Sequence, residues 1–331
     1  MSFSRIKGNS KLISSLKKLI DEGNFPSSSL FYGTAGCGKL MTAIETVKAH
    51  LCSGDPSSDG LFEQKPDKNE DGACGKCESC QQIEKRLHPD FRIVDASFQA
   101  ALLDEPVEKQ KNLKIDSLRE ISRFAYERPY VADKKFIVID DADTMTVEAQ
   151  NSFLKILEEP PKSSVIILTA SDKNLLLPTI VSRVFPFKFN PLSKEDLSDI
   201  LGESGLENRE AVFLADIAGG SVSKAMAFRE LMADFSSKKH LGRLLPFMMM
   251  PQRAQAFESR ARAKLILDFL TSVITTDKIR PALSFERKAR EVNLLLNYAS
   301  WLKHNVSPRI ITQLALTGYL KYGNFNFGEK V

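Results

Sequence analysis

The sequence lacks long apolar segments. No run reaches the roughly 18 residues that a membrane-spanning helix needs. Residues 1–20 also lack the apolar core and the small-residue cleavage site of a signal peptide. They predict an amphipathic helix instead, with apolar residues at helical spacing: Leu12, Ile13, Leu16, Leu19 and Ile20. We therefore expect a cytoplasmic protein that makes no membrane contact.

An excess of one charge is also missing. The 331 residues carry a formal net charge of +4, which is too small to indicate nucleic-acid binding by itself. Hydrophobic residues make up 43% and charged residues 27% of the chain, the balance of a globular protein. A chain of this length exceeds one ordinary core, so we expect two or three domains.

Cysteine is scarce, with five residues in the whole chain, and a reducing cytoplasm disfavours persistent disulfides. Three of them follow one another as Cys74-x-x-Cys77-x-x-Cys80, and Cys52 lies just before a polar stretch. Four thiolates suit a tetrahedral zinc ion and leave no open position for catalysis. We predict that Cys52, Cys74, Cys77 and Cys80 form a structural zinc site.

Other interpretations of the cysteines stay open. They could hold an iron–sulfur cluster or remain free thiols. His50 and His88 are possible substitute ligands. An all-thiolate site is preferred because it leaves only Cys37 outside the cluster.

Apolar runs alternate with helical patterns in the first part of the chain. The runs typical of buried strands are SSLFY (28–32), FRIVDA (91–96), KKFIVIDDAD (134–143) and SSVIILTAS (163–171). Helices are predicted at 38–51, 115–127 and 147–158. This alternation predicts an α/β fold with a parallel, doubly wound sheet. Beyond it only helices are expected, over 193–234, 263–276 and 291–304.

A glycine-rich loop follows the first predicted strand. Such a loop lets backbone N–H groups approach phosphate oxygens, while its lysine neutralises the outer phosphates. The residues of this P-loop pattern are Gly33, Thr34, Ala35, Gly36, Cys37, Gly38, Lys39 and Leu40. The last position normally carries a magnesium-binding hydroxyl, which Leu40 lacks. Nucleotide can still bind here, whereas efficient hydrolysis is not expected; an incidental glycine turn is the simpler alternative.

The predicted strand within 134–143 is apolar and ends in two carboxylates, Asp140 and Asp141. This is the Walker B pattern of an ATPase. Asp140 would help to hold magnesium. The next position usually carries a glutamate that polarises the attacking water, and Asp141 is shorter by one methylene. A displacement of about 1 Å can cost roughly a hundredfold in rate. Alternatively, the two carboxylates merely end a buried strand.

Several longer segments resemble one family. These are LHPDFRIVDA (87–96), IDSLREI (115–121), RPY (128–130), the stretch from Lys134 to Ser171 with its LEEPP (157–161), and LLPTIVSRV (176–184). Together with the P-loop and the cysteines they are similar to bacterial DNA polymerase III clamp-loader subunits of the AAA+ superfamily, closest to the delta-prime type. The resemblance covers about residues 1–230.

The resemblance implies a domain plan and a partner set. It predicts an AAA+ domain over 1–190 with a zinc module at about 50–82, a helical lid over 191–236 and a helical collar over 237–331. Members assemble as hetero-pentamers of gamma/tau, delta and delta-prime subunits. The ring uses ATP to load the sliding clamp onto primed DNA.

The resemblance also assigns roles to further residues. Ser182-Arg183-Val184 matches the family's Ser-Arg-Cys motif, in which the arginine reaches a neighbouring subunit's ATP. Thr169 matches the sensor-1 position. The lid arginine should lie in a turn that here reads Gly220-Ser221-Val222-Ser223-Lys224, so Ser223 stands in its place and Lys224 is displaced. An ordinary surface arginine and a strand-end hydroxyl are the simpler alternatives for Arg183 and Thr169.

Leu40, Asp141 and Ser223 each depart from the pattern of an active ATPase of this family. They favour a delta-prime-type subunit, a component of the polymerase holoenzyme whose own ATPase is weak or absent. The alternative is an active gamma/tau-type ATPase, although no extension follows the predicted collar. A third class is a zinc-knuckle nucleic-acid binder. Few aromatic residues accompany the cysteines, and the insert at 55–71 is more acidic than basic, which argues against it.

Overall fold

The computed structural model forms two compact units, residues 1–193 and 194–331. It describes the following ranges: 3–54, 72–236, 259–276, 284–304 and 306–322. Part of the predicted zinc module (55–71) lies outside the described residues. Four parts of the predicted collar also lie outside the described residues: 237–258, 277–283, 305 and 323–331.

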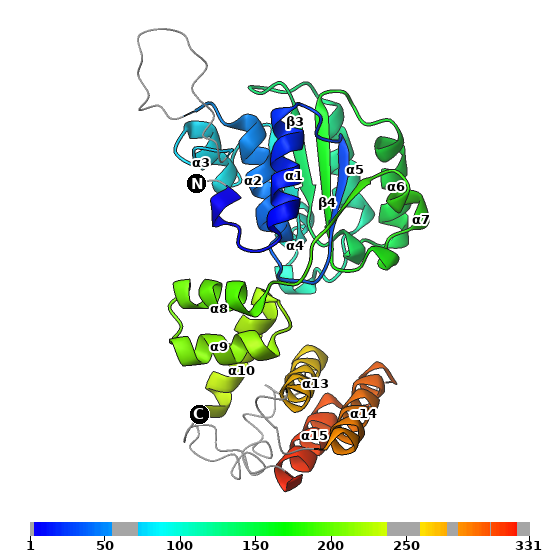
Figure 1. Cartoon of the computed structure of the whole chain (residues 1–331). Helices are drawn as coiled ribbons and strands as arrows, with labels where there is room; N and C mark the ends of the chain where they lie inside the picture. Colours follow the sequence, from blue (N-terminus) through cyan, green and yellow to red (C-terminus); the bar gives the residue numbers. More distant parts are fainter. Residues whose placement is uncertain (1–2, 55–71, 237–258, 277–283, 305, 323–331) are drawn as a thin grey trace. The chain divides into compact units, whose positions relative to one another are not determined.

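The first unit is built on a five-stranded parallel sheet (Figure 1). Its strands are β1 (Ser28–Tyr32), β2 (Phe91–Val94), β3 (Lys135–Ile139), β4 (Ser164–Ala170) and β5 (Phe185–Lys188). Their spatial order is β2-β3-β4-β1-β5. The register pairs Leu30 of β1 with Leu168 of β4, and Ile139 of β3 with the same Leu168. The predicted α/β fold with a parallel sheet is therefore confirmed.

Helices cover both faces of this sheet. They are α1 (Ser10–Asp21), α2 (Lys39–Leu51), α3 (Glu78–Glu84), α4 (Ala96–Leu103), α5 (Ile115–Tyr126), α6 (Val147–Glu158) and α7 (Pro178–Val181). Short 3₁₀ turns complete the unit at Phe3–Arg5, Val107–Lys109, Ala142–Thr144 and Lys173–Leu175. The predicted helices at 115–127 and 147–158 agree closely with α5 and α6.

Alternating side chains of the buried strands build two separate cores. Phe136 and Val138 of β3 pack with α1 and α2, including Leu16 and Val47. Ile137 and Ile139 of the same strand pack with α5 and α6 on the opposite face. Successive residues of a strand point to opposite faces, and both faces are covered here. That is why β3 and β4 read as continuous apolar runs.

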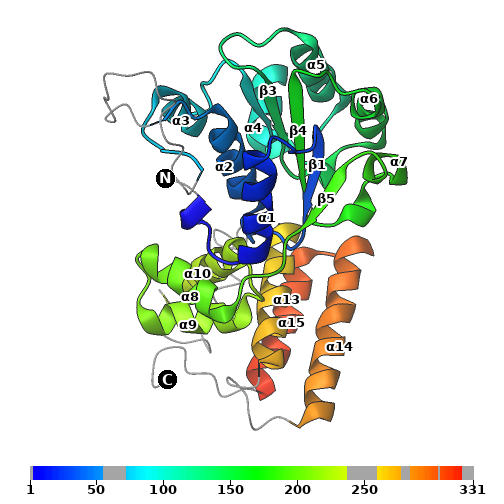
Figure 2. The same ribbon diagram turned by 45° about the horizontal axis from the view of Figure 1, so that its top comes forward.

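The edge strand β5 was not predicted from the sequence. It pairs with β1 alone, as Figure 2 shows. The segment is short and contains Pro186, which cannot donate a ladder hydrogen bond and is tolerated mainly on edge strands. Its signal was the alternation of Phe185 and Phe187 around that proline.

Every secondary-structure element described in the second unit is a helix. It contains α8 (Lys194–Glu203), α9 (Asn208–Ile217), α10 (Val222–Ser236), α13 (Arg260–Thr275), α14 (Phe285–Trp301) and α15 (Pro308–Tyr322), with a 3₁₀ turn at Leu302–His304. Helices α13, α14 and α15 pack against one another (Figure 2). None of the described helices alone is long and apolar enough to cross a bilayer. Only α9 taken together with the first part of α10 meets that test, across a bend of 117°.

Asp90 fixes the loop that leads into β3. Its buried carboxylate accepts hydrogen bonds from the backbone N–H groups of Tyr130, Val131 and Ala132, at 2.7, 2.8 and 2.8 Å. Burial alone would raise the pKa of Asp90, but these three donors hold it below its ordinary value. The charged carboxylate therefore stabilises the folded state.

We expect Asp90→Asn to lower the free energy of unfolding by about 2–4 kcal/mol at neutral pH, because an amide leaves at least one buried N–H group unpaired. Since the folded-state pKa is depressed, this contribution is complete above the unfolded-state pKa of Asp and is lost as the pH falls through the folded-state value. Urea unfolding at several pH values measures it. Asp133→Asn, at an exposed position of the same loop, is the matched control. Equal stability of the two variants at neutral pH would contradict this account.

Candidate functional site

The predicted P-loop connects β1 to α2 at the carboxyl end of β1. Gly33, Gly36 and Gly38 all have positive φ, at 147°, 72° and 95°. A Cβ atom at Gly33 would lie 2.2 Å from the carbonyl oxygen of Phe189, so this position also needs glycine for space. Gly38 is the N-cap of α2, which directs the amino end of that helix at the loop. The backbone is therefore shaped as a phosphate cradle.

The side chain of Lys39 is hydrogen-bonded to the backbone of the same loop. Its buried ammonium group donates to the carbonyl oxygens of Gly33 at 2.7 Å and Thr34 at 3.0 Å. A phosphate that entered the loop would have to replace these two acceptors. Buried Cys37 lies in the same loop, and burial raises the pKa of its thiol.

No hydroxyl at the start of α2 is available for a metal. The half-buried side chain of Leu40 packs against the core that contains α1 and α2. The hydroxyl of Thr42 donates to the Gly38 carbonyl oxygen at 2.8 Å inside its own helix. The donor set does not fit a magnesium ion held in the usual P-loop manner.

The acidic residues follow β3, beside the end of β4. The buried Thr169 hydroxyl donates to Asp140 Oδ1 at 2.6 Å and accepts from the backbone N–H of Asp141 at 3.0 Å. Asp141 has left-handed backbone angles, with φ 47°. The structure thus brings Thr169, Asp140 and Asp141 together at the edge that also carries the P-loop.

The charge of Asp141 is influenced by its neighbours. The residue as a whole is exposed, but its carboxyl group is partly desolvated, and this burial raises its pKa. The charges of Asp140 and Asp143 raise it further, while Lys39 lowers it. Asp143 itself accepts from the backbone N–H groups of Ser171 and Asp172, at 3.0 and 3.1 Å. The end of β3 is therefore a compact group of carboxylates near the P-loop lysine.

The four predicted cysteines converge. The Sγ atoms of Cys52, Cys74, Cys77 and Cys80 all lie within 4.8 Å of one another. Zinc–sulfur bonds of about 2.3 Å in a tetrahedron place sulfur atoms about 3.8 Å apart, and Cys52 and Cys77 are 3.9 Å apart. The cluster can therefore hold a metal ion.

Backbone N–H groups support these sulfur atoms. Cys74 N donates to Cys52 Sγ at 3.3 Å, and Cys77 N donates to Cys74 Sγ at 3.2 Å. Burial raises the pKa of the Cys52 and Cys80 thiols. At Cys77 hydrogen bonds involving Ser53 and Cys80 outweigh burial and lower the pKa to about 6. Such donors stabilise thiolate, the form that binds metals.

A buried lysine joins the cysteine cluster to the P-loop helix. Lys48 of α2 pairs with Glu45 of the same helix at 2.9 Å and with Glu84 of α3. Burial alone would lower the pKa of Lys48, but the two carboxylates raise it. The carboxylate of Glu84 lies one turn beyond Cys80, so the ion pair fastens α3 to α2.

The two histidines considered as substitute ligands, His50 and His88, lie outside the cysteine cluster. His50 packs its ring against Phe25 and Phe136, with centroid distances of 5.3 and 5.0 Å. The buried His88 accepts a hydrogen bond from the backbone N–H of Asp90 at 3.1 Å. Neither belongs to the cluster of ligand atoms formed by the cysteines. The geometry thus supports the all-thiolate interpretation.

Arg183 lies at the opposite end of the sheet from the P-loop. It precedes β5, whose first residue Phe185 pairs with Ser29 near the start of the parallel strand β1. It also lines a shallow cavity with Ser27 and Ser28, at the amino end of β1. A strand of five residues separates this end from the P-loop, roughly 16 Å at the rise of an extended chain. Arg183 cannot reach a nucleotide in its own P-loop.

The turn at the start of α10 carries no arginine. The Ser221 hydroxyl accepts from the backbone N–H of Lys224 at 3.1 Å, which caps the helix. Lys224 donates to Ser272 of α13 at 3.3 Å, and its ammonium lies 5.2 Å from the ring centroid of Phe228. Ser223 is exposed. Lys224, the cation of this turn, is therefore engaged with Ser272 of α13 and with a phenylalanine ring of its own helix.

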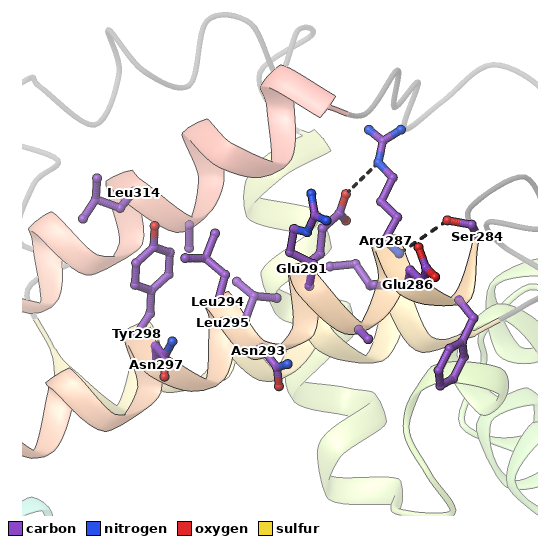
Figure 3. Close-up of a pocket in the computed structure, with 15 residues that line it drawn as sticks. Ser284, Glu286, Arg287, Glu291, Asn293, Leu294, Leu295, Asn297, Tyr298 and Leu314 are labelled. Carbon is purple, nitrogen blue, oxygen red and sulfur yellow. Dashed lines mark hydrogen bonds and ion pairs between the residues drawn. The ribbon is translucent and has the colours of Figure 1, made fainter.

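The second unit contains a separate open cavity along α14 (Figure 3). Leu294, Leu295 and Tyr298 of α14 and Leu314 of α15 line its apolar part. At its other end Arg287 pairs with Glu291 at 3.4 Å. None of the predicted site residues lines this cavity.

Sequence reasoning missed three charged residues of the site region: Lys48, Glu158 and Asp143. A weak signal existed for Lys48, because Glu45 lies one helical turn before it. The partners Glu84 of Lys48 and Arg183 of Glu158 are 36 and 25 residues away in sequence, so no local pattern indicated them.

The family described as DNA polymerase III, delta subunit, matches residues 8–193. The delta' subunit of Pseudomonas aeruginosa is 32% identical over 154 residues, 46% of this chain and 40% of that protein. The delta' subunit of Bacillus subtilis is 31% identical, over 60% of this chain and 52% of its own length. The gamma subunit of Buchnera aphidicola is 27% identical, over 77% and 65% respectively. The matched segments thus span about 40 to 65% of these relatives.

A solved structure shares the fold. The gamma subunit-related protein of Thermotoga maritima matches with a TM-score of 0.55 and 20% identity, over 94% of this chain and 99% of that one. The family match covers more than half of the present chain, including the P-loop, the acidic strand and the cysteine cluster. The chain therefore belongs to the family of DNA polymerase III clamp-loader subunits, within the AAA+ superfamily.

Proposed function

We propose that this chain is a delta-prime-type subunit of a DNA polymerase III clamp loader. It would join gamma/tau and delta subunits in a hetero-pentameric ring that loads the sliding clamp onto primed DNA. Its own contribution would be assembly, together with Arg183 offered to the ATP of a neighbouring subunit.

The location of Arg183 carries this proposal. Its side chain is 32% exposed at the amino end of the strands, while the P-loop of the same chain lies at the carboxyl end. If this guanidinium contacts the phosphates of a nucleotide, that nucleotide must be bound by another molecule. An arginine of this kind stabilises the charge that develops on the transferred phosphoryl group.

The chain's own nucleotide site supports weak hydrolysis or none. Leu40 packs into the core and supplies no metal ligand. The hydroxyl of Thr42 donates a hydrogen bond to the carbonyl oxygen of Gly38. Asp141 is one methylene shorter than the usual glutamate, and Ser223 replaces the lid arginine. These differences affect the metal, the attacking water and the phosphate respectively.

The glycine backbone nevertheless fits a nucleotide's phosphates. The loop N–H groups and the amino end of α2 would hold them, and Lys39 would turn from its two carbonyl acceptors to the outer phosphate. Bound ATP supplies a transferable phosphoryl group. The loop residues Gly33 to Lys39 would then bind nucleotide with little turnover.

The four-cysteine cluster fits zinc best. Four sulfur atoms within 4.8 Å of one another, with Cys52 and Cys77 3.9 Å apart, match its tetrahedral preference. The ion would join Cys52, at the end of α2, to the turn that starts α3. It would therefore stabilise a region with few other apolar side chains.

A gamma/tau-type ATPase is the second candidate. The hydrogen bond from Thr169 to Asp140 supports it, and a gamma subunit is among the relatives. The turnover of the isolated chain separates the two candidates.

The purified chain alone should hydrolyse ATP at least about a hundredfold more slowly than an active gamma/tau subunit assayed beside it, because metal and water handling are impaired. Steady-state phosphate release with and without magnesium measures this. A robust magnesium-dependent rate would favour the gamma/tau candidate.

Arg183→Ala should lower ATP hydrolysis at the adjoining site of a complex reconstituted with active neighbours, by up to about a thousandfold at that site. The same substitution should leave the isolated chain unchanged. Arg123→Ala is the matched control, since Arg123 is an exposed helical arginine paired with Glu120 at 3.2 Å. The finger assignment fails if the complex is insensitive to Arg183→Ala.

The purified chain should contain about one zinc ion, as measured by plasma mass spectrometry. Cys77→Ser should lower the zinc content and the Tm, because three ligands hold the metal less tightly and folding is coupled to binding. Cys37→Ala, which removes the one cysteine outside the cluster, should retain the metal. Loss of zinc from both variants alike would argue against this ligand set.

A further inference from the structure

Arg183 is held on both of its terminal nitrogens. Nη1 donates to the carbonyl oxygen of Thr179 at 2.8 Å and lies 3.3 Å from the Ser182 hydroxyl. Nη2 donates to Glu158 Oε1 at 2.5 Å. Thr179 and Ser182 belong to the same turn as the arginine, so they move with it. Glu158 comes from α6 and ties the guanidinium to another element.

The place of Glu158 in its helix is unfavourable for a carboxylate. It is the last residue of α6, where the helix dipole is negative and a cation would be preferred. Glu159 follows it, and then Pro160 and Pro161 prevent the helix from continuing. The helix gains nothing from an acid at this position. The charge is explained by Arg183, its ion-pair partner.

Glu158 and Arg183 line the same shallow cavity, with Leu157, Pro160 and Val184. Their side chains are 48% and 32% exposed, so the pair faces solvent rather than the core. Exposed ion pairs are weak. This one can bias the arginine toward one orientation and still yield to a phosphate, which carries more charge than a carboxylate.

We infer that Glu158 is a positioning residue for Arg183. Its carboxylate holds Nη2 so that the guanidinium stays at the mouth of the cavity, ready for the phosphates of a nucleotide bound by a neighbouring subunit. The remaining N–H groups of the arginine stay available for that contact. This inference rests on the proposed role of Arg183 as a trans-acting finger.

The test is the ATPase activity of the complex reconstituted with active neighbours. Glu158→Ala should lower kcat about three- to tenfold and leave KM nearly unchanged, because a misplaced finger affects the transition state more than nucleotide binding. Glu158→Gln keeps an acceptor oxygen and the side-chain shape, so its loss should be smaller. Glu159→Ala is the matched control, at an adjacent exposed glutamate.

Two further measurements separate positioning from a general structural effect. In an Arg183→Ala background, Glu158→Ala should cause no additional loss. The ratio of wild-type to Glu158→Gln activity should also shrink as salt is raised, since an exposed ion pair is screened. Unchanged thermal melting of Glu158→Gln would show that the fold is intact.

The outcomes are distinguishable. If Arg183→Ala lowers activity but Glu158→Ala and Glu158→Gln do not, the proposed function stands and the positioning role is overturned. A gain in activity, or a loss that persists without Arg183, overturns it as well. If Arg183→Ala itself has no effect, the proposed finger fails, and the inference about Glu158 fails with it.

Discussion

The common direction of the five strands is the constraint on which the arrangement of this chain depends. Because β1, β3 and β4 run parallel and side by side, the loops that leave them meet at one edge of the sheet. The P-loop, Asp140 and Thr169 therefore come together although they are far apart in sequence. Because β5 runs in the same direction, the segment before it, which contains Arg183, lies at the amino ends of the strands, opposite the P-loop. One sheet thus separates the chain's own nucleotide cradle from the arginine it presents outward.

The cradle is tied to the cysteine cluster through α2. Gly38 starts this helix at the phosphate loop, and Cys52 follows its last residue. Lys48 inside the helix fastens α3 through Glu84. Burying an ammonium group is costly unless it is paired, and the two carboxylates offset that cost. The metal-binding cluster and the phosphate loop are therefore supported by one rigid element.

Local patterns were sufficient for much of the fold. The apolar runs predicted β1 to β4 because both sides of each strand are covered, and the predicted helix at 147–158 has the bounds of α6. The edge strand β5 escaped because it is short and contains a proline. The helix α4, capped by Asp95, was also missed, since its eight residues show little amphipathic periodicity. Short elements leave too few residues for a period to be recognised.

The residue types of the site could be recognised in the sequence alone: the glycines and lysine of the loop, the acidic strand end and the Cys-x-x-Cys-x-x-Cys spacing. Each of these is encoded within a few consecutive residues, so local geometry dictates it. The folded chain was needed to show that Cys52, and neither His50 nor His88, completes the cluster. It was also needed to show that the loop's own carbonyl oxygens hold Lys39 and that Arg183 pairs with Glu158. The cysteine and arginine contacts join residues more than twenty positions apart. The lysine contact depends on the backbone conformation of the loop. The spacing of residues in the sequence predicts neither this conformation nor the long-range contacts.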